Sequence, residues 1–343
     1  NLKQQADMLP GSEAVKIDFS GLAHLDTAGA SVLVKLLGAK NLLETLDHTP
    51  LADAQKALLK AVAGSMTGSS TPPQAANPII LFFANLGRQV AYIAREHLLL
   101  AGFMGQTLAT LASLLPRPQR WRVTAFVAAV HDTGLNALPI VALLTFLVGA
   151  VVAFLGATVL EDFGATIYTV NLVAFSFLRE FGVLLAAILL AGRTASAFTA
   201  QIGAMKVNEE LDAIRTLGLS PIELLVIPRV LAMMVSLPIL TFVGMMSGMF
   251  GGALVSTLAL DIPFTQFTAI LQRDIALQHF LVGIGKAPVF AFLIAVIGCL
   301  EGFKVAGSAQ SVGQHTTSSV VQSIFMVILL DAIAALFFME MGW

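Results

Sequence analysis

Charged residues are scarce in this 343-residue chain, since Asp, Glu, Lys and Arg together make up 12% of it and hydrophobic residues 57%. A soluble domain is typically about one quarter charged, so the composition argues against an ordinary soluble protein and indicates a protein of the lipid bilayer. The formal net charge is −2, so the chain lacks the excess of basic residues that binding to nucleic acid requires. We therefore expect no nucleic-acid partner.

Cysteine and the common catalytic motifs are also lacking. Cys299 is the only cysteine, which excludes an internal disulfide and any multi-cysteine metal site. The six histidines are scattered without the spacing of a zinc-binding pair, so we predict no metal site and no catalytic residue. A Walker A loop is missing as well, because Gly283, Gly285 and Lys286 have the wrong spacing and lie in an apolar run. The chain itself is therefore expected to bind neither ATP nor another cofactor.

Long apolar runs divide the second half of the chain. A helix needs about 20 apolar residues to cross a bilayer, and five runs meet that length. We predict membrane-spanning helices near 135–160, 166–192, 228–258, 280–303 and 320–340. Shorter apolar runs between 79 and 133 alternate with basic residues, which predicts helices lying in the membrane interface. The expected fold is mainly α and polytopic.

Basic residues are distributed unequally between the predicted loops. The richer side holds Arg193, Lys206, Arg215, Arg229 and Lys304, together with the arginines that precede the first span. The other side holds Glu161, Asp162, Asp261 and Asp274, with Arg273 as its one basic residue. Since basic loops stay in the cytoplasm, the N-terminal part is predicted to be cytosolic and the C-terminus periplasmic.

Residues 1–65 have a different character. Val15–Phe19 alternates between apolar and polar residues and predicts a strand. Asp26 is placed to cap a helix over 28–37, and a second helix is expected over 51–62. We predict a small α/β domain, and because the chain begins at Asn1 without methionine we expect the rest of its sheet upstream. Residues 66–78, rich in Gly, Ser, Thr and Pro, predict a flexible linker.

Four charged residues fall well inside the predicted spans, away from the span ends. Arg179 and Glu180 lie near the middle of the second span, Lys286 in the fourth and Asp331 in the fifth. A charge there costs several kcal/mol unless it is paired or hydrated. Two roles are open: these residues line a substrate path or polar seam, or they form a structural ion pair between helices.

A short polar segment lies between the second and third spans. Apolar residues recur at helical spacing between 201 and 217, and Gly218 and Pro221 follow, which predicts one cytosolic helix. The residues predicted to contact a partner are Met205, Lys206, Glu209, Glu210, Asp212 and Arg215. The helix is either a docking element for a soluble partner or a solvated connector.

Glycines recur in two of the spans. They are Gly149 and Gly156 in the first, and Gly244, Gly248, Gly251 and Gly252 in the third. Such spacing lets helix backbones approach closely, so we expect a tightly packed bundle or a dimer.

Four motifs in this order carry a family resemblance: residues 177–182 (FLREFG), 190–203 (LAGRTASAFTAQIG), 205–217 and 227–229 (IPR). They resemble the core of the MlaE family, the permease subunits of MCE-type lipid ABC transporters, over about 79–343. The resemblance implies a mid-membrane pair at Arg179 and Glu180 and a coupling helix containing Glu209, Glu210 and Arg215. One departure is Val183, where the family has proline.

The resemblance also implies partners and a location. They are a second permease copy, two ATPase subunits that bind ATP and Mg²⁺, a periplasmic hexameric MCE protein, and phospholipid as cargo. The expected location is the inner membrane of a Gram-negative bacterium, with a role in outer-membrane lipid homeostasis.

Residues 18–29 (DFSGLAHLDTAG) resemble the strand-to-helix turn of a STAS domain. The resemblance places Thr27 where STAS domains often carry a phosphorylated hydroxyl, while Asp26 and Thr27 are equally suited to cap a helix. A STAS-linked secondary anion transporter is the main alternative function, and a membrane-anchored signalling protein is another. The anion transporters have many more spans and carry STAS after them, and a signalling role leaves the charges at Arg179 and Glu180 without explanation.

Overall fold

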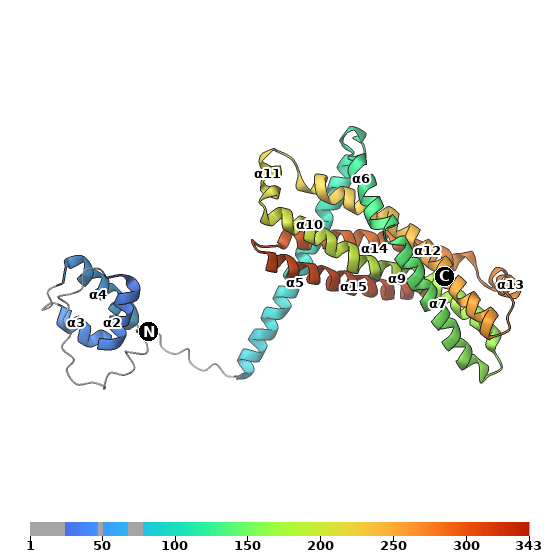
Figure 1. Cartoon of the computed structure of the whole chain (residues 1–343), viewed down its shortest axis with the longest axis horizontal. Coiled ribbons are helices and arrows are strands. Elements are labelled where there is room, and N and C mark those ends of the chain that lie inside the picture. Colours follow the sequence, from blue (N-terminus) through green and yellow to red (C-terminus); the bar gives the residue numbers. More distant parts are fainter. Residues whose placement is uncertain (1–24, 47–50, 68–77, 343) are drawn as a thin grey trace. The chain divides into compact units, whose positions relative to one another are not determined.

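The computed structural model describes residues 25–46, 51–67 and 78–342. The chain divides into two compact units, Asn1–Val90 and Ala91–Trp343, and each is described by itself. Every regular element within the described residues is a helix (Figure 1).

Three short helices form the N-terminal unit's core: α2 (Thr27–Leu37), α3 (Ala39–Thr45) and α4 (Asp53–Thr67). They bury a small apolar cluster, made of Ala30, Val34, Leu42, Leu46, Leu51, Leu59 and Ala63. Asp26 caps α2 as predicted, because its Oδ1 accepts a 2.7 Å hydrogen bond from the backbone N–H of Gly29. The helix expected over 51–62 is also present, as α4.

An α/β STAS-like domain is not shown by the structure. The described part of 1–65 contains helices only, and the strand expected at 15–19 lies outside the described residues. Of the linker expected over 66–78, residues 66 and 67 belong to α4 and residue 78 begins the next helix. Strong helix formers between Ala57 and Ala63 carry α4 through Gly64. Residues 68–77 lie outside the described residues.

Six helical segments in the described residues are long and apolar enough to cross a membrane, one more than predicted. They are Ile80–Leu114, Val123–Glu161, Thr166–Val207, Ile222–Ala259, Leu277–Lys304 and Ala309–Glu340. The first belongs to α5 (Pro78–Leu114), one continuous helix where the sequence predicted interfacial helices. Arg88, Arg95 and Glu96 interrupt its apolar run, so its mean hydropathy reaches only 1.3 against 2.0 to 2.7 in the others.

The remaining helices correspond to the five predicted spans and their connections. In chain order they are α6 (Val123–Val130), α7 (Leu138–Glu161), α8 (Thr169–Ser176), α9 (Gly182–Leu190), α10 (Ser196–Val207), α11 (Glu210–Thr216), α12 (Ile227–Ala259), α13 (Phe264–Asp274), α14 (Leu277–Lys304) and α15 (Ala309–Glu340). Two π-helical turns, η5 (Phe177–Phe181) and η6 (Ala191–Ala195), join α8, α9 and α10 into one long segment. Figure 1 shows α11 at one end of this bundle and α13 at the opposite end.

Close glycine contacts hold α7 against α12. A Cβ atom on Gly149 of α7 would lie 2.0 Å from the carbonyl oxygen of Gly248 on α12. One on Gly251 would lie 2.1 Å from the carbonyl oxygen of Phe146. The backbones touch at both points, which confirms the close helix approach predicted from the glycine spacing.

Gly149→Ala is therefore expected to destabilise the membrane unit by about 1–3 kcal/mol, because the added methyl must push two backbones apart. Gly285→Ala in α14 is the matched control, since nothing lies within 4 Å of a Cβ there. The measurement is the thermal unfolding midpoint of the purified proteins in detergent. Equal midpoints for the two variants would contradict the close contact of α7 and α12.

Candidate functional site

Four charged side chains meet inside the bundle, and we call them the charge cluster: Arg179, Glu180, Lys286 and Asp331. The Lys286 ammonium donates to Glu180 Oε2 at 2.5 Å and to Asp331 Oδ1 at 2.8 Å. Arg179 Nε lies 3.5 Å from Glu180 Oε1. Lys286 is 4% exposed, and Arg179 and Asp331 are each 8% exposed. The cluster balances two cations with two anions, as burial of charge requires.

The fold brings these residues together from three separate segments. Arg179 and Glu180 lie on the π-helical turn η5, Lys286 on α14 and Asp331 on α15. Gly283, one turn before Lys286, permits the approach, because a Cβ on it would lie 2.1 Å from the carbonyl oxygen of Leu178. π-Helical turns inside α-helices often occur at functional sites.

The charge cluster lies deep within the predicted spans. Lys286 is nine residues after Leu277, where α14 begins, and Asp331 is nine residues before Glu340, where α15 ends. At 1.5 Å per residue, Lys286 lies roughly 14 Å from the start of α14, and Asp331 lies the same distance from the end of α15. That depth is inside the hydrocarbon core of a bilayer, which is about 30 Å thick.

Arg179 and Glu180 point to different neighbours, as expected of adjacent helical residues. The Arg179 guanidinium lies 5.7 Å from the centre of the Phe175 ring, a cation–π distance. Glu180 instead faces Lys286, and its side chain is 24% exposed, the most of the four. Glu180 is therefore the member of the charge cluster most accessible to a passing polar group.

The segment over 201–217, predicted as one cytosolic helix, is broken in two. α10 ends at Val207, and α11 begins at Glu210 after a turn in which Glu209 adopts the left-handed conformation with φ 62°. The Lys206 ammonium donates to the carbonyl oxygen of Phe303 on α14 at 2.5 Å, which fixes the end of α10. Gly218, with φ 74°, follows α11 and ends it as predicted.

This break separates the predicted coupling residues into two groups. Met205 and Lys206 are partly buried at the end of α10, where they anchor it to the bundle. The exposed group is Glu209, Glu210, Asp212 and Arg215. α11 itself is held by one buried side chain, Leu211, which is 2% exposed. The partly buried Ile214 packs against the same core, so this short helix, with charges of both signs outward, offers a surface to a soluble partner.

A second buried set of charges was not predicted from the sequence. Glu301, which is 1% exposed, accepts from Lys304 Nζ at 2.8 Å and contacts His315 Nδ1 at 2.7 Å. Lys304 also bonds to Glu96, so the set ties α5 to α14 and α15. The i, i+3 spacing of Glu301 and Lys304 was a signal for their pairing. No sequence signal indicated the contact of Glu96 with Lys304, because the two residues lie 208 positions apart and Glu96 is in a segment predicted as interfacial.

An exposed ion pair stands at the other end of the bundle, on α13. The Arg273 guanidinium donates to Asp274 Oδ1 at 2.7 Å and holds the pKa of that carboxyl below its usual value. Asp274 in turn raises the pKa of Arg273. The basic residue of this loop is thus paired with an acid beside it.

Within the described residues, no group of three or more His, Cys, Asp or Glu side chains is placed to hold a metal ion. Cys299 is buried in the core and is not paired. The arrangement that stands out chemically is a balanced set of charges deep in an apolar bundle.

Residues 126–337, from α6 to α15, match the family described as Permease MlaE. The chain belongs to the MlaE permease family. The match contains the whole charge cluster and α11 but none of the N-terminal unit.

Known relatives of this MlaE-family permease span bacteria and plants. It is 33% identical over 257 residues to the intermembrane phospholipid transport system permease protein MlaE of Haemophilus influenzae. The aligned region is 74% of this chain and 96% of the Haemophilus influenzae protein. This chain is 32% identical over 262 residues to a probable ABC transporter permease protein of Rickettsia bellii, covering 76% and 99%. It is also 35% identical over 170 residues to the chloroplastic protein TRIGALACTOSYLDIACYLGLYCEROL 1 of Arabidopsis thaliana, covering 50% and 49%.

Family membership makes this chain a non-catalytic, multi-pass membrane component of an ABC transporter, consistent with the inner membrane. An ABC permease works with ATPase subunits, so its energy enters from other chains. That favours an ABC mechanism over the secondary anion transporter considered above, which would need no ATPase.

Proposed function

We propose that this MlaE-family permease moves phospholipid, or a similar amphiphilic lipid, between the inner membrane of a Gram-negative bacterium and periplasmic MCE carriers. Such transport contributes to outer-membrane lipid homeostasis. The observation that carries the proposal is the charge cluster, a balanced set of buried charges at mid-membrane depth. The similarity to the Haemophilus influenzae phospholipid permease supports the same cargo.

The charge cluster is suited to meet a lipid headgroup. A phosphate can replace one carboxylate on Lys286, because both are anions that accept short, charge-assisted hydrogen bonds from an ammonium. Lys286 bridges Glu180 on η5 to Asp331 on α15, so exchanging one partner weakens the link between these helices. In this proposal the closed bridge blocks the path, and engagement of the headgroup opens it.

Energy from the ATPase reaches the charge cluster along one helical segment. The continuous helical segment Thr166–Val207 contains η5 and ends at the turn beside α11. Glu180 and Val207 are 27 residues apart in this segment, which is roughly 40 Å at helical rise. A movement of α11, docked in a groove of an ATPase subunit, therefore shifts η5 relative to α14 and α15.

The assembly we propose has two copies of this permease, two ATPase subunits that bind ATP and Mg²⁺, and a hexameric MCE protein on the periplasmic side. In this arrangement five of the six candidate segments cross the membrane and α5 lies in its interface, so the N-terminal unit and α11 face the cytosol. The end of the bundle that carries α13 faces the MCE protein, with the C-terminus on the same side.

The test is co-purification of the tagged permease from its native membrane, followed by an ATPase assay. We expect an ATPase subunit to accompany it, and hydrolysis to rise several-fold when phospholipid is added, because cargo favours the conformation that closes the ATPase dimer. The permease alone should hydrolyse no ATP. Absence of an ATPase subunit, or hydrolysis indifferent to phospholipid, would contradict the proposal.

A further inference from the structure

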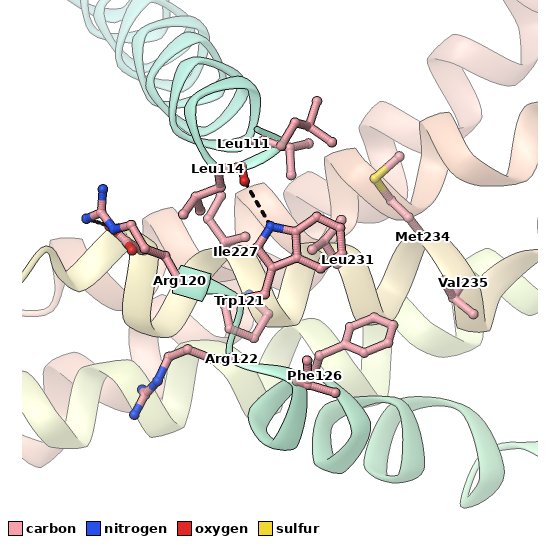
Figure 2. Close-up of a pocket in the computed structure, with 14 residues that line it drawn as sticks. Leu111, Leu114, Arg120, Trp121, Arg122, Phe126, Ile227, Leu231, Met234 and Val235 are labelled. Atoms are coloured by element: carbon pink, nitrogen blue, oxygen red, sulfur yellow. Dashed lines mark hydrogen bonds and ion pairs between the residues drawn. The ribbon is translucent and has the colours of Figure 1, made fainter. Parts of the chain in front are cut away.

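An apolar pocket with a volume of about 280 Å³ lies between the end of α5, the start of α6 and α12. Leu114, Trp121, Phe126, Leu231 and Met234 are among its lining residues (Figure 2). The Trp121 indole donates to the carbonyl oxygen of Leu114 at 2.8 Å, which fixes the ring as one wall. The pocket is thus shaped by ordered apolar side chains and is large enough for part of an acyl chain.

A polar pocket of about 450 Å³ lies beside it, between α6, α10 and α12. Three arginines line it, Arg122, Arg193 and Arg229, against a single acid, Asp132. Arg229 is held in place by Gln201 Oε1 at 3.0 Å and by the carbonyl oxygen of Leu225 at 2.9 Å. No carboxylate within the described residues forms an ion pair with any of the three arginines. The polar pocket therefore has an uncompensated positive charge.

The two pockets share a wall. Arg122 and Pro228 line both of them, so an apolar cavity and a cationic one meet at these residues. Figure 2 shows the Arg122 side chain extending away from Met234 and Val235, the apolar end of the first pocket. The neighbouring Arg120 is neutralised by Glu223 at 2.7 Å, whereas Arg122, at the junction, forms no ion pair with the described part of the chain.

We propose that the paired pockets bind one amphiphile, with its tail in the apolar pocket and its anionic phosphate among Arg122, Arg193 and Arg229. Guanidinium groups suit this ligand because their planar donors match phosphate oxygens in pairs. The location is separate from the charge cluster, since Arg193 lies 13 residues after Glu180 on the same helical segment, roughly 20 Å away. By the bias of basic residues, the site faces the cytosolic leaflet.

This inference requires only that the chain spans a membrane, and it does not depend on the transported cargo. A lipid held here either waits for transport or steadies α6 against α12. In both cases the bound molecule is a phospholipid from the bilayer, because a free phosphate would leave the apolar pocket empty.

The test is photo-crosslinking of the full-length protein in lipid nanodiscs. Two probes carry the same diazirine tail, one a phosphatidylglycerol and the other a diacylglycerol without phosphate. We expect the phosphatidylglycerol probe to label peptides containing Trp121–Phe126 and Leu231–Val235. The diacylglycerol probe should label them roughly tenfold less, the loss expected when charge-assisted hydrogen bonds are missing.

Variants separate the two halves of the site. Arg122→Gln and Arg193→Gln should each lower labelling by phosphatidylglycerol several-fold, while Arg117→Gln, an exposed arginine that lines neither pocket, should not. Leu231→Trp should block both probes by filling the apolar pocket, whereas Leu258→Trp, 76% exposed on the same helix, should block neither. The exposed arginine variants keep the test valid if Leu231→Trp fails to fold.

Three results would overturn the proposal. Equal labelling by the two probes would mean that the arginines do not bind the phosphate. Full competition by inorganic phosphate alone would assign the polar pocket to a soluble anion. Cross-links from the apolar pocket to a second copy of the chain, in place of lipid, would make the pocket a subunit interface.

Discussion

Replacing Lys286 with methionine is expected to stop lipid transfer and to lower the free energy of unfolding by about 3–5 kcal/mol. The substitution leaves Glu180 and Asp331 facing each other without the cation that joins them. Removing one member of a buried ion pair costs this much because the remaining charges stay desolvated. The thermal unfolding midpoint and the rate of lipid transfer should therefore fall together.

A neutral double variant distinguishes the two roles that the sequence left open. Combining Lys286→Met with Asp331→Asn removes one cation and one anion and leaves Glu180 beside Arg179, so most of the lost stability should return. Lipid transfer should stay absent, because Lys286, the cation proposed to meet the headgroup, is gone. Full recovery of transfer in the double variant would show that the bridge is only a structural ion pair.

The exposed pair of Arg273 and Asp274 provides the control for Lys286. Arg273→Met also removes a cation from an ion pair, but this one lies on the surface of α13. Surface pairs contribute little to stability, so the midpoint and the transfer rate should both remain near those of the unaltered protein.

Reversing the charge of Glu209 and Glu210 together, as Glu209→Lys with Glu210→Lys, is expected to uncouple the transporter. Both side chains are exposed, beside and on α11, so the fold should tolerate the change. If α11 docks on the ATPase, placing like charges at that contact costs several kcal/mol and should reduce phospholipid-stimulated ATP hydrolysis by roughly tenfold or more. The assay compares hydrolysis by assembled complexes with and without added phospholipid.

The matched control reverses an adjacent acidic pair at the C-terminal end of α7, as Glu161→Lys with Asp162→Lys. These residues are also exposed but lie in a loop predicted to be periplasmic. Stimulated hydrolysis should persist in this variant. If the two double variants behaved alike, α11 would be a solvated connector and energy would enter elsewhere.

Much of the membrane unit could be predicted because a spanning helix has a strong and local signal. The runs around 135–160 and 280–303 needed only length and absence of charge to be recognised, and α7 and α14 correspond to them. α5 was harder because Arg88, Arg95 and Glu96 interrupt its apolar run. The N-terminal strand rested on residues 15–19, which lie outside the described residues.

The charge cluster was partly foreseeable for an energetic reason. A charge in the bilayer core needs a partner, so Lys286 and Asp331 were the natural candidates for Arg179 and Glu180. Which pairs form depends on how η5, α14 and α15 pack, and that depends on close contacts such as Gly283 against Leu178. Sequence spacing contains no such information.

The break between α10 and α11 had only a weak sequence signal, Asn208 after Lys206, which suits a helix end. Neither Asn208 nor Glu209 is glycine or proline, yet Glu209 adopts a left-handed backbone that non-glycine residues seldom take. The contact of Lys206 with Phe303, on a helix nearly 100 residues later, helps to hold the chain there. Such a tertiary constraint overrides the helical periodicity of 201–217.

Transfer of a labelled phospholipid between proteoliposomes containing the assembled complex and an acceptor carrier tests the central claim most directly. We predict transfer that requires ATP hydrolysis, is abolished by Lys286→Met and is unaffected by Arg273→Met. Transfer that continued without ATP, or that persisted at the full rate in the Lys286→Met complex, would contradict the account.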